Sequence, residues 1–167
     1  MAQLKPVTTG GLLKDVNDNF AALAPVGLFD GLSQRRTAVC TFDAGGEGNP
    51  NQAVGAHAAG WKVPANAIMV GGVVDVVQAF TGEAGATLAV SIAQANDIVA
   101  AAAVGGVPWS TTGLKAIVPK ANTPEATGIK LTAAKAITFT VGTAALTAGR
   151  VVVYLDYYEG VETESGE

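Results

Sequence analysis

The first apolar pattern along the chain has the period of a helix. Between residues 12 and 24 one apolar side chain recurs every three or four positions, in the series Leu13, Val16, Phe20 and Leu23. The charged and amide residues between them fall outside that stripe, as on an amphipathic helix. Pro25 follows directly and cannot continue a helix. The pattern therefore predicts a short amphipathic helix at 12–24.

After residue 36 the pattern changes to the period of a strand. Short segments with alternating residues and many β-branched side chains are separated by turn-forming residues. The strands predicted in this way are 37–42, 68–80, 88–92, 114–118, 128–132, 137–141 and 151–157. Gly71 and Gly72, inside the longest strand, predict a bulge or a close approach of another backbone. The last two strands predict a hairpin within one sheet, joined by the eight residues of GTAALTAG.

Two segments do not follow the strand pattern. Residues 43–60 have no periodicity and many turn formers, which predicts a long loop. Asn96 and Asp97 are residue types that cap helices, and they precede the alanine-rich segment 98–104 and a glycine pair. This order predicts one short helix at 98–104.

Together these elements predict a mainly β protein. About seven short strands with little helix are typical of a β-sandwich, and we expect one that is jelly-roll-like. The predicted parts are an N-terminal arm with the amphipathic helix at 1–35, the β-sandwich domain at 36–158, and an acidic C-terminal tail at 159–167. The helix of the arm packs either on its own sandwich or on a neighbouring molecule.

Composition excludes several classes of protein. The chain of 167 residues is 49% hydrophobic and 14% charged, which suits one globular domain. A formal net charge of −4 disfavours binding to the phosphates of nucleic acid. The longest uncharged apolar run, 98–107, has about half of the roughly 20 residues that a membrane-spanning helix needs. The first residues lack the apolar stretch of a signal peptide. We therefore expect no nucleic-acid partner, no membrane partner and no secretion signal.

Residues that could carry chemistry are scattered along the sequence. His57, the single histidine, has no nucleophile or orienting carboxylate near it. Cys40 lies in the middle of a predicted strand, where a small buried thiol is expected. Asp75 interrupts an apolar strand, so it either faces outward or pairs with a basic residue across a sheet or an interface. No spacing resembles a zinc cage, a calcium loop or a phosphate-binding loop. We therefore expect no catalytic residues, no metal, no cofactor and no enzymatic activity.

The aromatic residues point to burial rather than to sugar binding. Trp61 and Trp109 stand beside turns, and three tyrosines crowd the last predicted strand. Their neighbours are valine, leucine and alanine rather than the polar residues that would hold sugar hydroxyls. This setting favours the core or an interface.

The chain resembles structural proteins of tailed bacteriophage virions. In residues 63–104 a strand leads through Phe80 and a glycine turn into a second strand and then to Asn96. The closing sequence KAITFTVGTAALTAGRVVVYLDYY is similar to the end of those proteins, and VNDNFAAL is similar to a helix at the start of many phage head- or tail-fibre proteins. The resemblance lies in hydrophobicity and turns, and residues 43–60 have no counterpart in it.

The resemblance implies a capsid cement (decoration) protein. Such a protein binds the outside of a phage capsid and stabilises contacts between subunits of the major capsid protein, through many weak contacts on a closed shell. Its implied partners are the major capsid protein and copies of itself, as a trimer in the first place and as a dimer in the second. Its implied location is the capsid surface of the virion, after synthesis in the host cytoplasm.

The alternative is a head- or tail-fibre or receptor-binding protein with an N-terminal virion anchor. A fibre usually has a longer shaft built from repeats, and this sequence shows no internal repeat. Hundreds of copies per particle would indicate cement, and a dozen or fewer would indicate a fibre.

The residues expected to bind a partner form the apolar stripe of the arm, which consists of Leu13, Val16, Phe20 and Leu23. An isolated helix of about 13 residues is marginally stable in water, so this stripe must dock on another surface. Phe20 is the expected anchor, because aromatic side chains dominate the energetics of interfaces.

Overall fold

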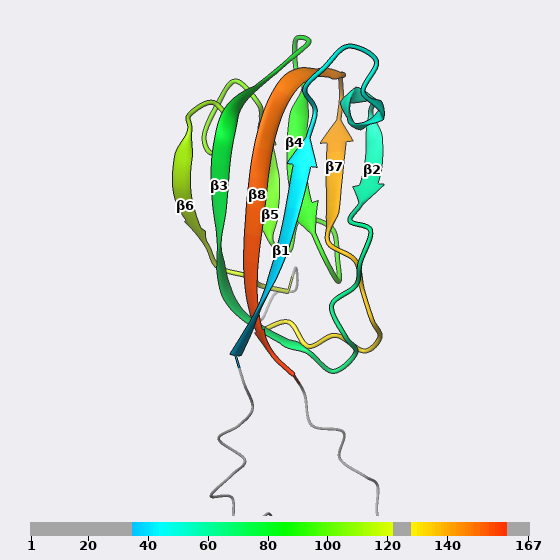
Figure 1. Cartoon of the computed structure of the whole chain (residues 1–167), viewed down its shortest axis with the longest axis vertical. Coiled ribbons are helices and arrows are strands. Elements are labelled where there is room, and N and C mark those ends of the chain that lie inside the picture. Colours follow the sequence, from blue (N-terminus) through cyan, green and yellow to red (C-terminus); the bar gives the residue numbers. More distant parts are fainter. Residues whose placement is uncertain (1–34, 122–127, 160–167) are drawn as a thin grey trace, which may run out of the picture. The chain divides into compact units, whose positions relative to one another are not determined.

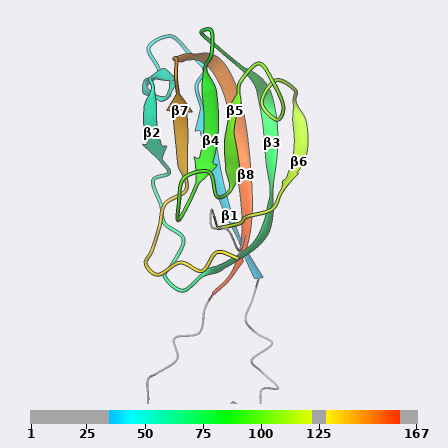
Figure 2. The same cartoon turned by 180° about the vertical axis from the view of Figure 1, so that it is seen from behind.

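The computed structural model describes residues 35–121 and 128–159. The described chain is mainly β and forms two antiparallel sheets with a shared core, which confirms the predicted class (Figures 1 and 2). The predicted helix at 12–24, its four stripe residues and the end of the acidic tail lie outside the described residues. Among the described residues, no helix is long and apolar enough to cross a membrane.

Each sheet has four strands. Sheet A has the order β1 (Arg35–Asp43), β8 (Leu146–Tyr158), β3 (Ile68–Gly82) and β6 (Gly113–Ile117). Sheet B has the order β2 (Gly55–Ala58), β7 (Thr138–Gly142), β4 (Thr87–Ser91) and β5 (Val99–Ala103). A single turn of 3₁₀ helix, η3 (Pro50–Gln52), lies between β1 and β2.

The core lies between the sheets and contains a chain of aromatic rings. Phe42 of β1 stacks on Phe139 of β7 with ring centroids 4.7 Å apart, so this pair joins the two sheets. Phe80 of β3 meets Trp109 edge to face at 5.7 Å. Trp109 is fully buried, and its indole N–H donates to the carbonyl oxygen of Leu88 at 2.9 Å. Buried indoles need such an acceptor, so this bond fixes the ring beneath sheet B.

The predicted helix at 98–104 is wrong, because this segment forms β5. Asp97 accepts hydrogen bonds from the backbone N–H groups of the residues before it, so it closes the turn after β4 instead of capping a helix. Asn96 stands in the left-handed region with φ 65°. Val99 and Ala102 pack against the core while β5 pairs with β4. Alanine's helix propensity is worth a few tenths of a kcal/mol per residue, and this packing outweighs it.

The predicted hairpin at the end of the chain is also wrong. β7 belongs to sheet B and β8 to sheet A, and residues 143–145 carry the chain from one sheet to the other. β8 begins at Leu146, which is buried opposite Gly82, so the expected eight-residue connection is mostly strand. The inward positions of its second half are as the alternation predicts, namely Val151, Val153, Leu155 and Tyr157.

The expected loop, one expected strand and the glycine pair of β3 can each be compared with the structure. The expected loop at 43–60 contains η3 and the edge strand β2. The expected strand at 128–132 is reduced to a single bridge between Ile68 and Lys130. The glycine pair in β3 behaves as predicted in both respects: the register shifts between Met69 and Gly71, and a Cβ on Gly72 would lie 2.5 Å from the carbonyl oxygen of Tyr154.

Candidate functional site

His57 and Cys40, two residues whose side chains could carry out chemistry, are held by packing and backbone contacts. His57 is on β2, where its ring is 5.8 Å from that of Phe42 and its Nε2 is 2.9 Å from the carbonyl oxygen of Ala53. Cys40 is buried in β1, and this burial raises the pKa of its thiol to about 12, so the thiol stays protonated near neutral pH. Among residues 35–121 and 128–159, no three His, Cys, Asp or Glu side chains gather as metal ligands would.

One hollow on the described surface offers few side chains that could carry out chemistry. It has a volume of about 390 Å³ and lies at the turn between β3 and β4, beside the end of β5. Small residues dominate its lining, and Glu83 is the one charged side chain there. An acid–base site needs at least two groups in mutual reach, and this lining supplies one.

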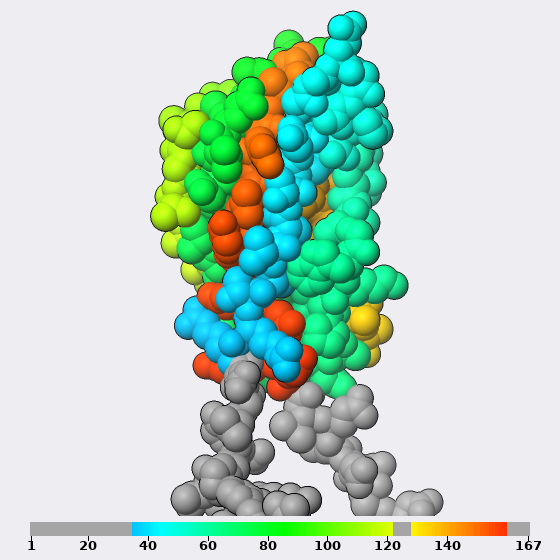
Figure 3. Space-filling view, viewed as in Figure 1, coloured from blue at the N-terminus to red at the C-terminus, as the bar shows by residue number. Residues whose placement is uncertain are grey.

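The outer faces of the two sheets differ in character. The outward positions of sheet B carry small or hydroxyl side chains, namely Ala56, Ala58, Thr87, Ala89, Ser91, Thr138 and Thr140. The outward positions of sheet A are mixed. Six of them carry large apolar side chains, which we call the A face and define as Val39, Val73, Val77, Leu114, Val152 and Tyr154, and polar residues such as Thr41, Asp75 and Gln78 stand among them. Sheet A turns this face to the viewer in Figure 3, where its four strands run side by side.

Strand register places the A face residues in adjoining rows. Val39, Tyr154 and Val73 lie opposite one another across β1, β8 and β3. The next row carries Val152 and Leu114 on either side of Asp75. Leu114 is 72% exposed, Val77 51% and Val39 47%. Soluble proteins rarely leave large contiguous apolar patches in water, and such a patch usually marks a binding surface.

Ion pairs border the A face at both ends. Arg35 pairs with Asp156, which also accepts a hydrogen bond from the hydroxyl of Thr37. The Thr37 hydrogen bond, together with Arg35, holds the pKa of Asp156 below its usual value. At the other end the Nε atom of Arg150 is 3.8 Å from a carboxylate oxygen of Asp43. The polar rim and apolar centre together have the anatomy of a protein interface.

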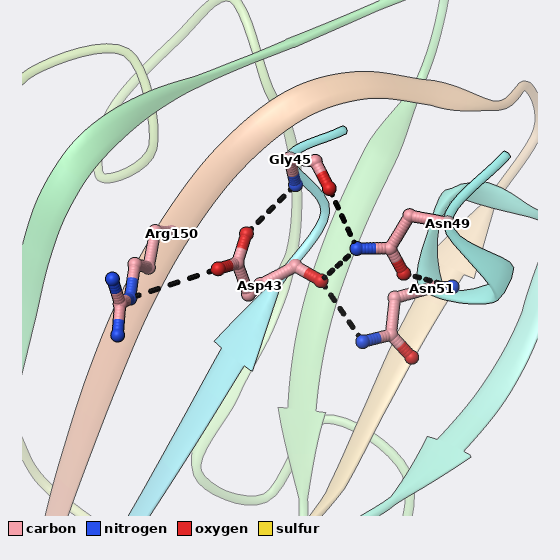
Figure 4. A network of polar contacts seen from close by, with 5 residues as sticks. All are labelled: Asp43, Gly45, Asn49, Asn51 and Arg150. Atoms are coloured by element: carbon pink, nitrogen blue, oxygen red, sulfur yellow. Dashed lines mark hydrogen bonds and ion pairs between the residues drawn. The ribbon is translucent and has the colours of Figure 1, made fainter. Parts of the chain in front are cut away.

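The segment after β1 is held by its own polar side chains (Figure 4). Asp43 accepts the N–H of Gly45 at 2.7 Å, and the Asn49 side chain donates to the carbonyl oxygens of Asp43 and Gly45. Asn51 donates to the same Asp43 carbonyl at 2.9 Å. Gln52 then donates to the carbonyl of Thr147 on β8 at 3.1 Å. This network gives the irregular segment a defined shape without a ligand.

Sequence reasoning missed the A face, although a signal for it was present. In β8, Val152 and Tyr154 are apolar residues that alternate with inward-facing ones, and β3 carries the apolar Val73 before the buried Val74 and the apolar Val77 at the register shift after the buried Val76. A strand with one face exposed to solvent should have polar residues at those positions. Apolar residues on both faces are typical of a sheet that is covered on both faces.

No protein-family model matches the sequence, and no curated protein matches it either. The structure is similar to a chain of the cyanophage Pam1 capsid asymmetric unit, with a TM-score of 0.53, 18% identity, and coverage of 75% of this chain and 84% of that chain. It is also similar to a chain of the acidic stable capsid structure of Helicobacter pylori bacteriophage KHP30, with a TM-score of 0.50, 14% identity, and coverage of 74% and 86%. The sandwich therefore has a fold that also occurs in two bacteriophage capsid structures.

Proposed function

We propose that this chain is a non-enzymatic structural protein of a bacteriophage virion. In this proposal it binds the outside of the capsid and stabilises contacts between subunits of the major capsid protein. The observation that carries the proposal is the A face, a large apolar surface on a sandwich whose fold also occurs in capsid structures. A cement protein needs such a surface, because covering it supplies the free energy of attachment.

The proposed mechanism is repeated binding without turnover. Each copy covers its A face against the shell, and neighbouring copies associate as trimers, so contacts that are weak individually act together around a closed shell. Arg35 and Tyr158 lie opposite each other in sheet A, so the chain enters and leaves the sandwich at one end of this face. At the opposite end of the A face lies the hydrogen-bond network around Asp43.

The first prediction concerns copy number and reattachment. Purified particles are expected to contain hundreds of copies of the protein, as quantified by mass spectrometry against the major capsid protein. Particles assembled without it are expected to bind the purified chain to the same level and to resist heating better afterwards. A dozen copies or fewer per particle would contradict the proposal and favour the fibre or receptor-binding alternative.

The second prediction concerns the arm, whose stripe we propose as a second contact with a neighbouring copy or capsid subunit. Phe20→Ala is expected to weaken trimer formation or capsid binding about 30-fold, as loss of an aromatic interface anchor does. The sandwich should stay folded by circular dichroism. Sedimentation and capsid binding measure the effect, with Asn19→Ala, off the stripe, as the matched control.

A truncated chain that starts at Ala24 should behave like Phe20→Ala. Binding of this truncated chain to capsids as tightly as the full chain would contradict the proposed contact. A large fall in the melting temperature of the isolated monomer would instead show that the stripe packs on its own sandwich.

A further inference from the structure

Asp75 is an acidic residue in the middle of the A face. Val152 and Leu114 lie opposite it on the two neighbouring strands, and Val73 and Val77 lie two positions away along β3. Its side chain is half-buried. Among the described residues, none forms a hydrogen bond or an ion pair with it. Arg150, the next outward residue of β8 on one side of Val152, pairs with Asp43 instead. Asp75 is thus a carboxylate with aliphatic side chains directly opposite it and without a hydrogen-bond or ion-pair partner among the described residues.

Three acidic residues at the ends of β1 and β8 have basic partners. Asp156 pairs with Arg35, Glu159 with Arg36, and Asp43 with Arg150. These are the three arginines of the sequence, so each already has an acidic partner. The contrast singles out Asp75 as the one charge on this face that the sheet itself does not neutralise.

Coverage of the A face would make an unpaired Asp75 costly. A carboxylate that is moved from water into an apolar contact loses its hydration, and this loss is tolerated only when a cation or hydrogen-bond donors replace the water. Aspartate is also depleted in strands, where a valine would fit the pleated surface better. A partner that covers this face must therefore bring a positive charge to Asp75, because otherwise the lost hydration of the carboxylate would weaken binding.

We infer that the A face binds a segment of the major capsid protein in which aliphatic side chains surround one lysine or arginine, and that this cation pairs with Asp75. The inference rests on the proposed function and names the partner chemistry of the same surface. A second copy stacked face to face would instead place its own Asp75 on the same patch and bring like charges together. The charge pair sets the position of each copy on the shell, and the valines supply the contact area.

The test compares full-length variants for binding to particles assembled without the protein. Asp75→Asn is expected to lower the affinity at least ten-fold, and Asp75→Lys to lower it further, because each leaves the partner's cation unpaired. Asp75→Val is expected to lower the affinity as well, although it should raise the melting temperature of the free protein by about 3 °C. Glu47→Gln removes an exposed charge from the η3 end of the sandwich and is the matched control, with unchanged binding.

The outcomes separate this inference from the proposed function. Wild-type affinity in Asp75→Asn and Asp75→Val would overturn the cation pairing, while the proposed function would stand if Leu114→Glu still lost binding. Failure of the wild-type chain to bind particles would overturn the proposed function itself. A lower melting temperature in Asp75→Asn would also overturn the inference, because it would show a partner for Asp75 within the chain. A change in trimer formation without a change in capsid binding would assign the cation to a second copy instead.

Discussion

Gly149→Ala is expected to destabilise the sandwich by about 4 kcal/mol. Gly149 is buried and is the fourth residue of β8. Its φ is +137°, a conformation that side chains other than glycine rarely adopt. An added Cβ would also lie 2.2 Å from Cδ1 of Phe80, far inside van der Waals contact.

The Phe80 ring cannot easily move away from an added Cβ, because other aromatic rings pack against it. It stacks with Phe42 at 6.2 Å between centroids and meets the buried Trp109 edge to face. Backbone strain of about 1–3 kcal/mol therefore adds to an overpacking cost of a similar size. Since natural domains are stable by only about 5–15 kcal/mol, a large share of the variant should be unfolded or aggregated.

Urea unfolding followed by tryptophan fluorescence measures this effect, because Trp109 is buried against the displaced ring. Gly60→Ala is the matched control, since a Cβ on Gly60 meets nothing within 4 Å. This control should stay within about 0.5 kcal/mol of the wild type. A Gly149→Ala variant within 1 kcal/mol of the wild type would contradict the described packing of β8 on Phe80.

Asp97→Ala is expected to cost a comparable amount, about 3–4 kcal/mol of unfolding free energy. Asp97 is 1% exposed, and its two oxygens accept the N–H groups of Ile92, Ala93 and Gln94 at 2.8–2.9 Å. Alanine would leave these backbone donors without their acceptor at the end of β4. Hydrogen bonds to charged groups contribute about 1.5–3 kcal/mol each, and water restores part of what is lost.

The measurement is the midpoint of chemical unfolding, with Glu47→Ala as an exposed acidic control. Hydrogen exchange adds a local reading, since the amide N–H groups of residues 92–94 should lose protection first in Asp97→Ala. Unchanged stability together with unchanged protection would show that Asp97 does not hold this turn.

The sandwich could be predicted because local patterns reflect burial. The alternation in β8 identified Val151, Val153 and Leu155 as inward, and all three are buried. Period-two alternation arises from the pleat itself, so it is visible in a single sequence. The environment of Cys40, buried in the middle of β1, was predictable for the same reason.

The wrong elements were those decided by distant parts of the chain. The segment 98–104 is alanine-rich and has capping residues before it, so local propensity favours a helix, and only pairing with β4 makes it β5. The connection after Gly142 contains no local sign that β8 belongs to the other sheet. Sheet membership depends on which strands bury their inward faces together, and this is a property of the whole core.

The candidate interface needed the structure for a similar reason. Asp75 was notable in the sequence as an acid in an apolar strand, with two interpretations left open. Its neighbours Val152 and Leu114 come from strands far away in the sequence, and the order β1-β8-β3-β6 alone brings them together. That strand order brings residues that are far apart in the sequence together in the A face.

The most direct test of the account is a reconstruction of the purified particle at a resolution that shows side chains. We expect the sandwich in hundreds of copies on the outside of the shell, with Tyr154 and Leu114 in contact with the major capsid protein and a lysine or arginine beside Asp75. Density that leaves the A face in solvent, or that places the chain at a single vertex or on the tail, would contradict it.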